Sequence, residues 1–172
     1  MDKFLRQTSA HAKTLTDKQN KPFGSAQDKQ KLLKIARALI GTPYKYGATP
    51  ESDGIPKYLD CSSFTQYVYK QIGIDIPRST ILQAAKAGTK IQLSITNYQL
   101  LNIGDLLFFR GSKGHYNDEL FPEKKVYIGH VTLYIGSNKV LHGSSKKGKI
   151  SEEKLKNLIN KMGNVTIAKR II

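Results

Sequence analysis

Cys61 is the only cysteine in the 172-residue chain. No disulfide can form within the chain, so a disulfide-stapled scaffold is excluded. By count alone, a lone cysteine is most often a small buried hydrophobic residue. A chemical role for Cys61 must therefore be argued from its surroundings in the sequence.

Long apolar runs are also missing. No stretch reaches the ~18 apolar residues that read as a membrane-spanning helix. The opening residues, MDKFLRQTSAHAKTLTDKQNKPF, lack the apolar segment of a secretory signal, so no signal peptide is visible in this sequence. Tryptophan is absent, but apolar residues make up 39% of the chain, which suffices for the packed core of one domain.

Negative charge is scarce. The chain has 28 Lys and Arg against 13 Asp and Glu, and its formal net charge is +15. Such a basic surface attracts anionic partners, among them nucleic acid, acidic membrane and cell-wall polymer. The lysines are spread along the chain, and neither an arginine-rich recognition helix nor a set of aromatic platforms is present. We therefore do not expect nucleic acid to be the partner.

The pattern of apolar residues changes along the chain. Residues 1–26 are polar, basic and aperiodic, which predicts an arm ahead of a folded domain over 27–172. Helices are predicted first, over residues 27–41, 61–73 and 79–88, with a loop over 42–60. Strands follow at 106–109, in two runs between 126 and 145, and at 165–172, with one more helix at 152–162. This order predicts an α+β fold in which helices pack on one antiparallel sheet.

Cys61 begins the helix predicted over residues 61–73. Phe64, Val68 and Ile72 follow it at helical spacing, so this stripe faces the core and the thiol lies at the N-terminal end. Asp60 is placed to cap the helix. The unpaired N–H groups of a helix N-terminus favour a thiolate and can also stabilise an oxyanion. The local sequence thus predicts a nucleophilic cysteine.

A base must reach the thiol, and two of the four histidines lie in the predicted hairpin between residues 126 and 145. If the turn is centred near Ser137, His142 lies opposite Thr132 and diagonal to His130 on the same face, with Cβ atoms roughly 7–8 Å apart. A two-residue turn would put one histidine on the opposite face. In the first register, His142 can orient His130 as a third residue orients the base in other cysteine enzymes.

Other interpretations of these residues remain open at this point. His130 and His142 could bind zinc if Cys61 completed the set, although no further ligand is evident and we predict no metal and no cofactor. A non-catalytic wall-binding module would have no need of a nucleophile at a helix N-terminus. Tyr44 and Tyr46 could simply pack their loop, and Arg78 could be a solvated surface charge.

Five sequence blocks occur together in the order and spacing of the NlpC/P60 peptidases, and the chain resembles that family over roughly residues 30–145. The blocks are GTPYKYGA (41–48), LDCSSFTQYVYKQIGIDIPRST (59–80), NIGDLLFF (102–109), GHVTLYIG (129–136) and VLHGSS (140–145). The resemblance implies a papain-like α+β catalytic domain. It also implies hydrolysis of bonds next to D-γ-glutamyl residues in bacterial peptidoglycan stem peptides.

The resemblance carries roles onto individual residues. It implies that Cys61 is the nucleophile, His130 the general base and His142 the orienting third residue. The residues that it places around the substrate are Tyr46, Asp60, Ser62, Arg78 and Ser79. The expected partner is peptidoglycan or its muropeptide fragments, bound by a monomer in the bacterial cell envelope or outside the cell. Within this scheme Asp60 would pair with a free substrate amine, and Arg78 and lysines of residues 110–128 would meet substrate carboxylates.

The chain departs from the family pattern at three places. Ser63 stands where a glycine is common, Ala48 stands where a second glycine is common, and the segment 110–128 is longer and more charged than usual. Because that segment could shape the mouth of the cleft, substrate choice stays open. The alternative function is that of a cysteine amidase, acyltransferase or toxin effector acting on another amide or ester.

Overall fold

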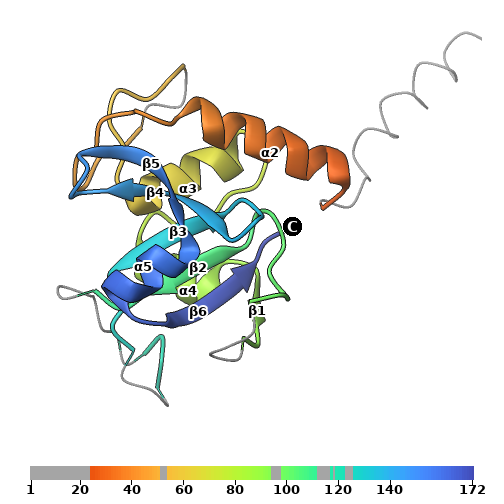
Figure 1. Cartoon of the computed structure of the whole chain (residues 1–172), viewed down its shortest axis with the longest axis vertical. Helices are drawn as coiled ribbons and strands as arrows, with labels where there is room; N and C mark the ends of the chain where they lie inside the picture. The colour runs from red at the N-terminus through yellow and green to blue at the C-terminus, as the bar shows by residue number, and fades with distance from the viewer. Residues whose placement is uncertain (1–23, 51–53, 94–97, 112–116, 118, 123–125) are drawn as a thin grey trace, which may run out of the picture.

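The computed structural model describes residues 24–50, 54–93, 98–111, 117, 119–122 and 126–172. The helices are α2 (Ala26–Ala38), α3 (Cys61–Lys70), α4 (Thr80–Lys86) and α5 (Leu155–Met162). The strands are β1 (Thr89–Ile91), β2 (Leu106–Phe109), β3 (His130–Tyr134), β4 (Lys139–Ser144), β5 (Lys149–Lys154) and β6 (Val165–Arg170) (Figure 1). Most of the arm predicted over residues 1–26 lies outside the described residues, and α2 begins at Ala26 after a Ser25 cap.

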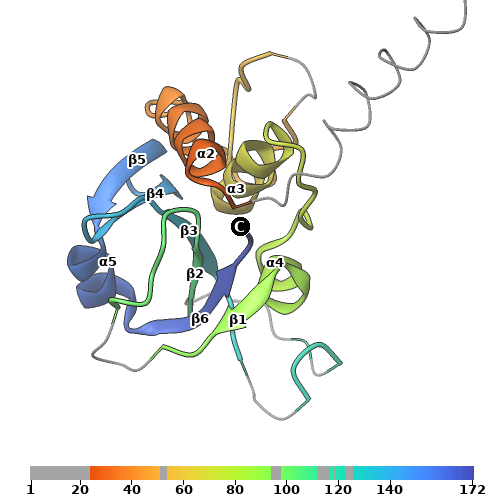
Figure 2. The same ribbon diagram turned by 90° about the vertical axis from the view of Figure 1, so that its right-hand side faces the viewer.

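The six strands form one sheet in the order β1-β6-β2-β3-β4-β5, and each neighbouring pair is antiparallel. In Figure 2, α2 and α3 lie together on one side of the strands, and α5 lies away from them, below β5. The predicted α+β fold with helices packed on an antiparallel sheet is confirmed. No helix in the described ranges is long and apolar enough to span a bilayer.

Two apolar clusters cover the two faces of the sheet. The first core, between the sheet and helices α2 and α3, includes Leu32, Phe64, Val68, Phe108, Val131, Leu133, Leu141 and Ile150. The second core, between the sheet and α5, includes Leu107, Phe109, Tyr134, Val140, Leu155, Leu158 and Ala168. Because both faces are covered, β2 is an unbroken apolar run instead of an alternating one, with all four of its residues buried.

Helix α3 is fixed by the apolar stripe that the sequence predicts. Phe64 and Val68 are fully buried and Ile72 is 8% exposed, all in the first core. Burying each such side chain stabilises the fold by roughly 1.5–3 kcal/mol. The helix packs on β3 and β4, so its N-terminus lies against the two strands that carry the histidines.

The structure corrects the sequence prediction at the C-terminal side. The helix predicted over residues 152–162 begins only at Leu155, because Lys149–Lys154 form β5 and pair with β4. Helix propensity is a weak preference that six cross-strand pairs override. Strand β1 was not predicted either. The correction places Glu153 in a strand, with its side chain buried.

Candidate active site

The N-terminus of α3 is closed by a reciprocal cap. Asp60 Oδ1 accepts a hydrogen bond from Ser63 N at 2.7 Å, and Ser63 Oγ accepts one from Asp60 N at 2.8 Å. The predicted Asp60 cap is therefore present. Ser63, which departs from the family glycine, supplies the second half of this capping box. Cys61 becomes the first residue of a firmly anchored helix.

The Cys61 thiol is enclosed by α4 and β3. Its sulfur lies 3.7 Å from Thr80 Oγ1 and also contacts the backbone N–H of Val131. Burial raises the pKa of Cys61, and hydrogen bonds from Thr80 and the Val131 N–H oppose that rise. The resting thiol therefore keeps its proton at neutral pH and needs a base to become a nucleophile.

The two hairpin histidines meet as the sequence predicted. Leu133 pairs with Leu141 and Tyr134 with Val140, a register that places His142 across from Thr132. Ile135 N donates to the Lys139 carbonyl at 3.0 Å, so the loop comprises residues 136–138 and is longer than two residues. Ser137 and Asn138 in this loop have positive φ angles of 50° and 56°.

This register brings the rings into contact. His130 Nε2 lies 2.9 Å from His142 Nδ1, and the ring planes are nearly perpendicular, at 84°. Burial lowers the pKa of both histidines, and mutual repulsion lowers that of His130 further. Both rings are therefore neutral at rest, so one nitrogen in the contact donates and the other accepts. The other ring nitrogen of His130, Nδ1, is not engaged in this contact.

A cleft of about 700 Å³ collects these groups. Its lining includes every site residue predicted from the sequence, namely Tyr46, Asp60, Cys61, Ser62, Arg78, Ser79, His130 and His142. Tyr46 stands at the rim with 77% of its surface exposed. Ser79 caps α4 through Leu82 N. Residues distant along the chain thus converge on one opening.

Arg78 binds groups of the site, so it is not a solvated charge. Its guanidinium donates to Asp60 Oδ2 at 2.7 Å, to Ser62 Oγ at 2.8 Å and to the Ala48 carbonyl at 2.6 Å. Burial alone would raise the pKa of Asp60, but the bonds from Arg78 and the Ser63 N–H outweigh it and hold that pKa below its ordinary value. Asp60 is therefore an anion whose charge is already paired.

The loop before α3 is tied to the same carboxylate. Gly47 N donates to Asp60 Oδ2 at 3.0 Å, which fixes the position of the neighbouring Tyr46. Tyr44 lines the cleft, and burial together with the nearby Cys61 and Asp60 raises its pKa to about 12. Tyr44 therefore remains a neutral phenol, able to donate a hydrogen bond.

Three residues important to the geometry were missed by sequence reasoning. Thr80 follows the Arg78-Ser79 pair directly, so its proximity to Cys61 could have been suspected. Gly143 follows His142 but shows no local signal of its role. Glu153 was assigned to a helix. The lysines proposed within 110–128, Lys113, Lys124 and Lys125, lie outside the described residues, whereas Lys146, Lys147 and Lys161 line the cleft.

Gly143 allows the N-terminus of α3 to approach β4. A Cβ at this position would lie 2.9 Å from both Asp60 C and Cys61 N, and these are backbone atoms that cannot rotate away. We expect Gly143→Ala to push Cys61 away from His130. Because a shift near 1 Å can cost ~10²-fold in rate, kcat/KM should fall by that order. Steady-state kinetics measure it.

Ile167→Ala serves as the control for Gly143→Ala. Ile167 lies on β6 in the first core, and its truncation should cost about 2–5 kcal/mol of stability without moving Cys61. The control should lower Tm and keep kcat/KM near the wild-type value at a temperature where it is folded. An unchanged rate in Gly143→Ala would show that close contact between α3 and β4 is not required.

Comparison with known proteins identifies relatives of this arrangement. The model of the NlpC/P60 family matches residues 41–168. A probable endopeptidase of Corynebacterium glutamicum is 32% identical over 132 residues, covering 76% of this chain and 50% of that protein. A γ-D-glutamyl-L-lysine dipeptidyl-peptidase of Bacillus subtilis is 34% identical over 152 residues, covering 88% of this chain and 40% of that protein. The chain thus spans about half the length of these relatives, or less.

A solved structure agrees with the sequence relatives. The NlpC/p60 domain of the peptidoglycan hydrolase SagA is 27% identical, has a TM-score of 0.59, and covers 83% of this chain and 97% of that domain. The family resemblance drawn from the five sequence blocks is therefore confirmed. Within the described ranges, no group of three or more His, Cys, Asp or Glu side chains is arranged to hold a metal ion.

Proposed function

This chain belongs to the NlpC/P60 family, and we propose that it is a cysteine peptidase that cleaves amide bonds next to D-γ-glutamyl residues in peptidoglycan stem peptides. The observation that supports the proposal most is the convergence of Cys61, His130 and His142 on one cleft. The Bacillus subtilis relative named as a γ-D-glutamyl-L-lysine dipeptidyl-peptidase supports the substrate class. Peptidoglycan as substrate places the site of action in the cell envelope or outside the cell.

The proposed reaction proceeds through an acyl-enzyme. His130 Nδ1 takes the thiol proton of Cys61 as the sulfur attacks the carbonyl carbon. N–H groups at the N-terminus of α3 stabilise the resulting oxyanion. His130 then protonates the leaving amine as the C–N bond breaks, and a water molecule activated by His130 hydrolyses the thioester. His142 holds the His130 ring in place through the 2.9 Å contact.

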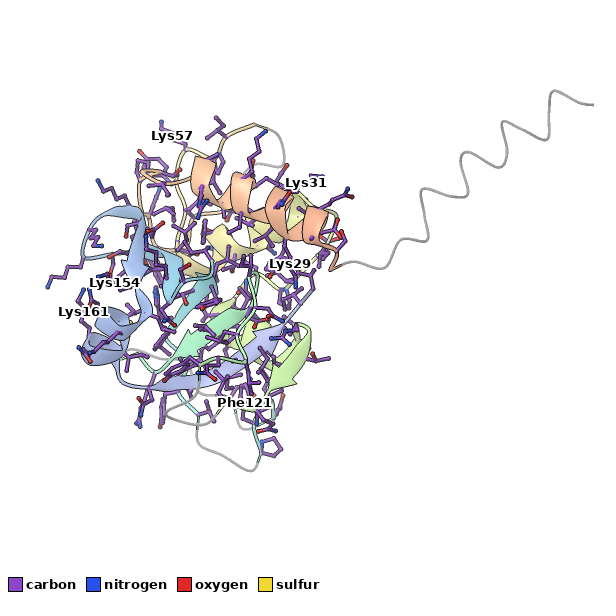
Figure 3. All side chains as sticks on the ribbon, turned by 45° about the vertical axis from the view of Figure 1, so that its right-hand side comes forward. Lys29, Lys31, Lys57, Phe121, Lys154 and Lys161 are labelled. Atoms are coloured by element: carbon purple, nitrogen blue, oxygen red, sulfur yellow. The ribbon has the colours of Figure 1, made fainter. Side chains whose placement is uncertain are left out.

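Charge around the cleft supports an anionic peptide as substrate. Lys146, Lys147 and Lys161 line the cleft, and although Lys147 and Lys161 are paired with Glu153, the excess positive charge can attract the carboxylates of a stem peptide. Figure 3 shows labelled lysines on different sides of the molecule, with Lys29 and Lys31 on α2 and Lys154 and Lys161 near β5 and α5. This spread favours long-range attraction to an anionic wall over a focused nucleic-acid groove.

If Asp60 binds a substrate amine, it must do so while keeping the hydrogen bonds that its carboxylate already accepts. Both carboxylate oxygens already accept hydrogen bonds, Oδ1 from Ser63 N and Oδ2 from Arg78 and Gly47 N. A substrate amine would therefore bind a carboxylate that already accepts hydrogen bonds from the protein. Arg78 similarly keeps Asp60 and Ser62 in position while it borders the substrate.

Matched peptides test the proposed substrate. We expect a peptide with a γ-linked D-Glu to be cleaved and its α-linked L-Glu isomer to be spared, since the carbonyl and the free carboxylate exchange places between them. Mass spectrometry of the products locates the broken bond, and a Cys61→Ala preparation controls for contaminating enzymes. Equal cleavage of both isomers, or preferential hydrolysis of an ester, would instead support the amidase or acyltransferase alternative.

A further inference from the structure

A buried carboxylate lies behind the histidine pair. Glu153 is on β5, across from Val140, and Ser151 is across from His142, so Glu153 and His142 are diagonal neighbours on the same face. Glu153 Oε2 lies 3.4 Å from His142 Nε2, an ion-pair contact outside regular hydrogen-bond geometry, and the two side chains are only 6% and 5% exposed. The contact extends the chain of polar groups from His130 through His142 to Glu153.

Two lysines keep Glu153 ionised. Lys161 of α5 donates to Oε1, and Lys147 of the β4–β5 turn lies 3.6 Å from Oε2. Figure 3 labels Lys161 beside α5. Burial alone would raise the pKa of Glu153, but these lysines and His142 outweigh it and hold that pKa below its ordinary value. An ionised carboxylate only accepts hydrogen bonds.

The Glu153 carboxylate determines which ring nitrogens of His142 and His130 carry a proton. A proton on His142 Nε2 faces Glu153, which leaves Nδ1 of the neutral ring as an acceptor. His130 Nε2 must then donate across the 2.9 Å contact. The neutral His130 ring consequently has its lone pair on Nδ1, the nitrogen that has to accept the proton of Cys61. The opposite tautomer of His142 would put that proton on His130 Nδ1 and block the transfer.

The other polar neighbours of His142 cannot impose this order. Thr132 and Ser151 are its cross-strand neighbours on β3 and β5, and their hydroxyls are buried with no hydrogen-bond partner among the described residues. A hydroxyl can donate or accept, so it suits either tautomer. The carboxylate of Glu153 only accepts, so it favours the single tautomer of His142 that carries its proton on Nε2.

We propose that Glu153 is a positioning residue of the active site, which holds His142 in the Nε2–H tautomer and thereby keeps Nδ1 of His130 free to accept the proton of Cys61. This inference rests on the proposed cysteine mechanism. The negative charge also favours the imidazolium that forms during proton transfer. Lys147 and Lys161 face the same carboxylate and moderate its charge.

Substitution of Glu153 tests the role in catalysis. We expect Glu153→Gln to lower kcat by about 10–100-fold with little change in KM, by analogy with the loss of a group that orients a metal-ligating histidine. Glu153→Asp keeps the charge and should retain more activity than Glu153→Gln. The control is Glu152→Gln, because Glu152 is the next residue on β5 and pairs with Lys139 instead; its rate should be near wild type.

The pH profile separates charge from packing. The charges of Lys147 and Lys161 face Glu153 in this environment, and the profile reports the coupled titration of Cys61, His130 and His142. Glu153 raises the pKa of both histidines against the lowering by burial. In Glu153→Gln, the limb that reports the imidazolium should therefore move to lower pH. A lower rate with an unmoved profile would overturn the electrostatic part of the role.

A double-mutant cycle separates positioning from a structural role. In His142→Asn, the Asn carbonyl can accept from His130 Nε2 whatever group lies behind it. Glu153→Ala should therefore cost about 10–100-fold beside His142 and almost nothing beside Asn. Equal costs in both backgrounds would show that Glu153 only anchors α5 to β5, and would overturn the proposal. Tm values confirm that each compared variant is folded.

Nitrogen-15 NMR of the histidine rings tests the tautomer without any substrate. The resting wild-type protein should show His142 protonated on Nε2, and Glu153→Ala should lose that preference. His142 protonated on Nδ1 in the wild type would overturn the inference, whatever the protein hydrolyses. By contrast, full activity of Cys61→Ala would overturn the proposed mechanism and leave the observed tautomer standing.

Discussion

Replacing Cys61 by alanine is expected to abolish peptide hydrolysis while leaving the fold intact. The thiol supplies the bond-forming atom, so kcat/KM should fall by roughly 10⁴-fold or more, as it does when a nucleophile is removed from a catalytic triad. The side chain is small and sits at the first position of α3, where Asp60 and Ser63 provide the cap. The helix does not depend on the sulfur. Kinetics on a γ-D-glutamyl peptide, with Tm as the check on folding, measure the effect.

Cys61→Ser is the matched variant for this result. Serine preserves the shape and a hydrogen bond to Thr80, but its hydroxyl is far harder to ionise than a thiol. It should be nearly as inactive as the alanine variant and at least as stable. A folded Cys61→Ala protein that still cleaves the peptide would remove Cys61 from the mechanism, and with it the whole cysteine peptidase proposal.

His130→Ala is expected to lower kcat by about 10²–10⁴-fold, the range for loss of a general acid or base. The loss arises because the proposed reaction assigns to His130 both the acceptance of the thiol proton and the protonation of the leaving amine. His142→Ala should cost less, since a water molecule can replace part of an orienting hydrogen bond. Steady-state kinetics across pH, with folding checked by circular dichroism, give both values.

His115→Ala is the control for the histidine variants. His115 is a histidine of the segment 110–128, away from the hairpin, and it lies outside the described residues. Its substitution should leave kcat near the wild-type value. A greater loss in His115→Ala than in His130→Ala would mean that the base comes from residues 110–128 and that the hairpin pair has another role.

Local physical chemistry explains why part of the site could be predicted from sequence. Asp60, Cys61 and the stripe ending at Ile72 lie within 13 consecutive positions, where capping and helical periodicity act over one or a few turns. The His130–His142 pair also depends on a short-range feature, because the turn at Ser137 and Asn138 determines the register of the hairpin.

Contacts between distant segments account for what sequence reasoning missed. Arg78 reaches Asp60 and Ala48 across a loop and a helix, and no periodicity predicts that geometry. The space that Gly143 provides for Asp60 and Cys61 exists only once α3 packs on β4. Residue types at these positions are compatible with many other arrangements, so composition and spacing carry little information about them.

The contrast is sharpest at residues 152–162. By itself the sequence determined a cysteine at a helix N-terminus and two histidines on one hairpin face, because each depends on neighbours a few residues away. It favoured a helix at Glu153, since Glu, Lys and Leu are good helix formers. Only the tertiary structure decided otherwise: pairing with β4 drew Lys149–Lys154 into the sheet, where long-range hydrogen bonds outweigh a small local preference and bury Glu153 against His142.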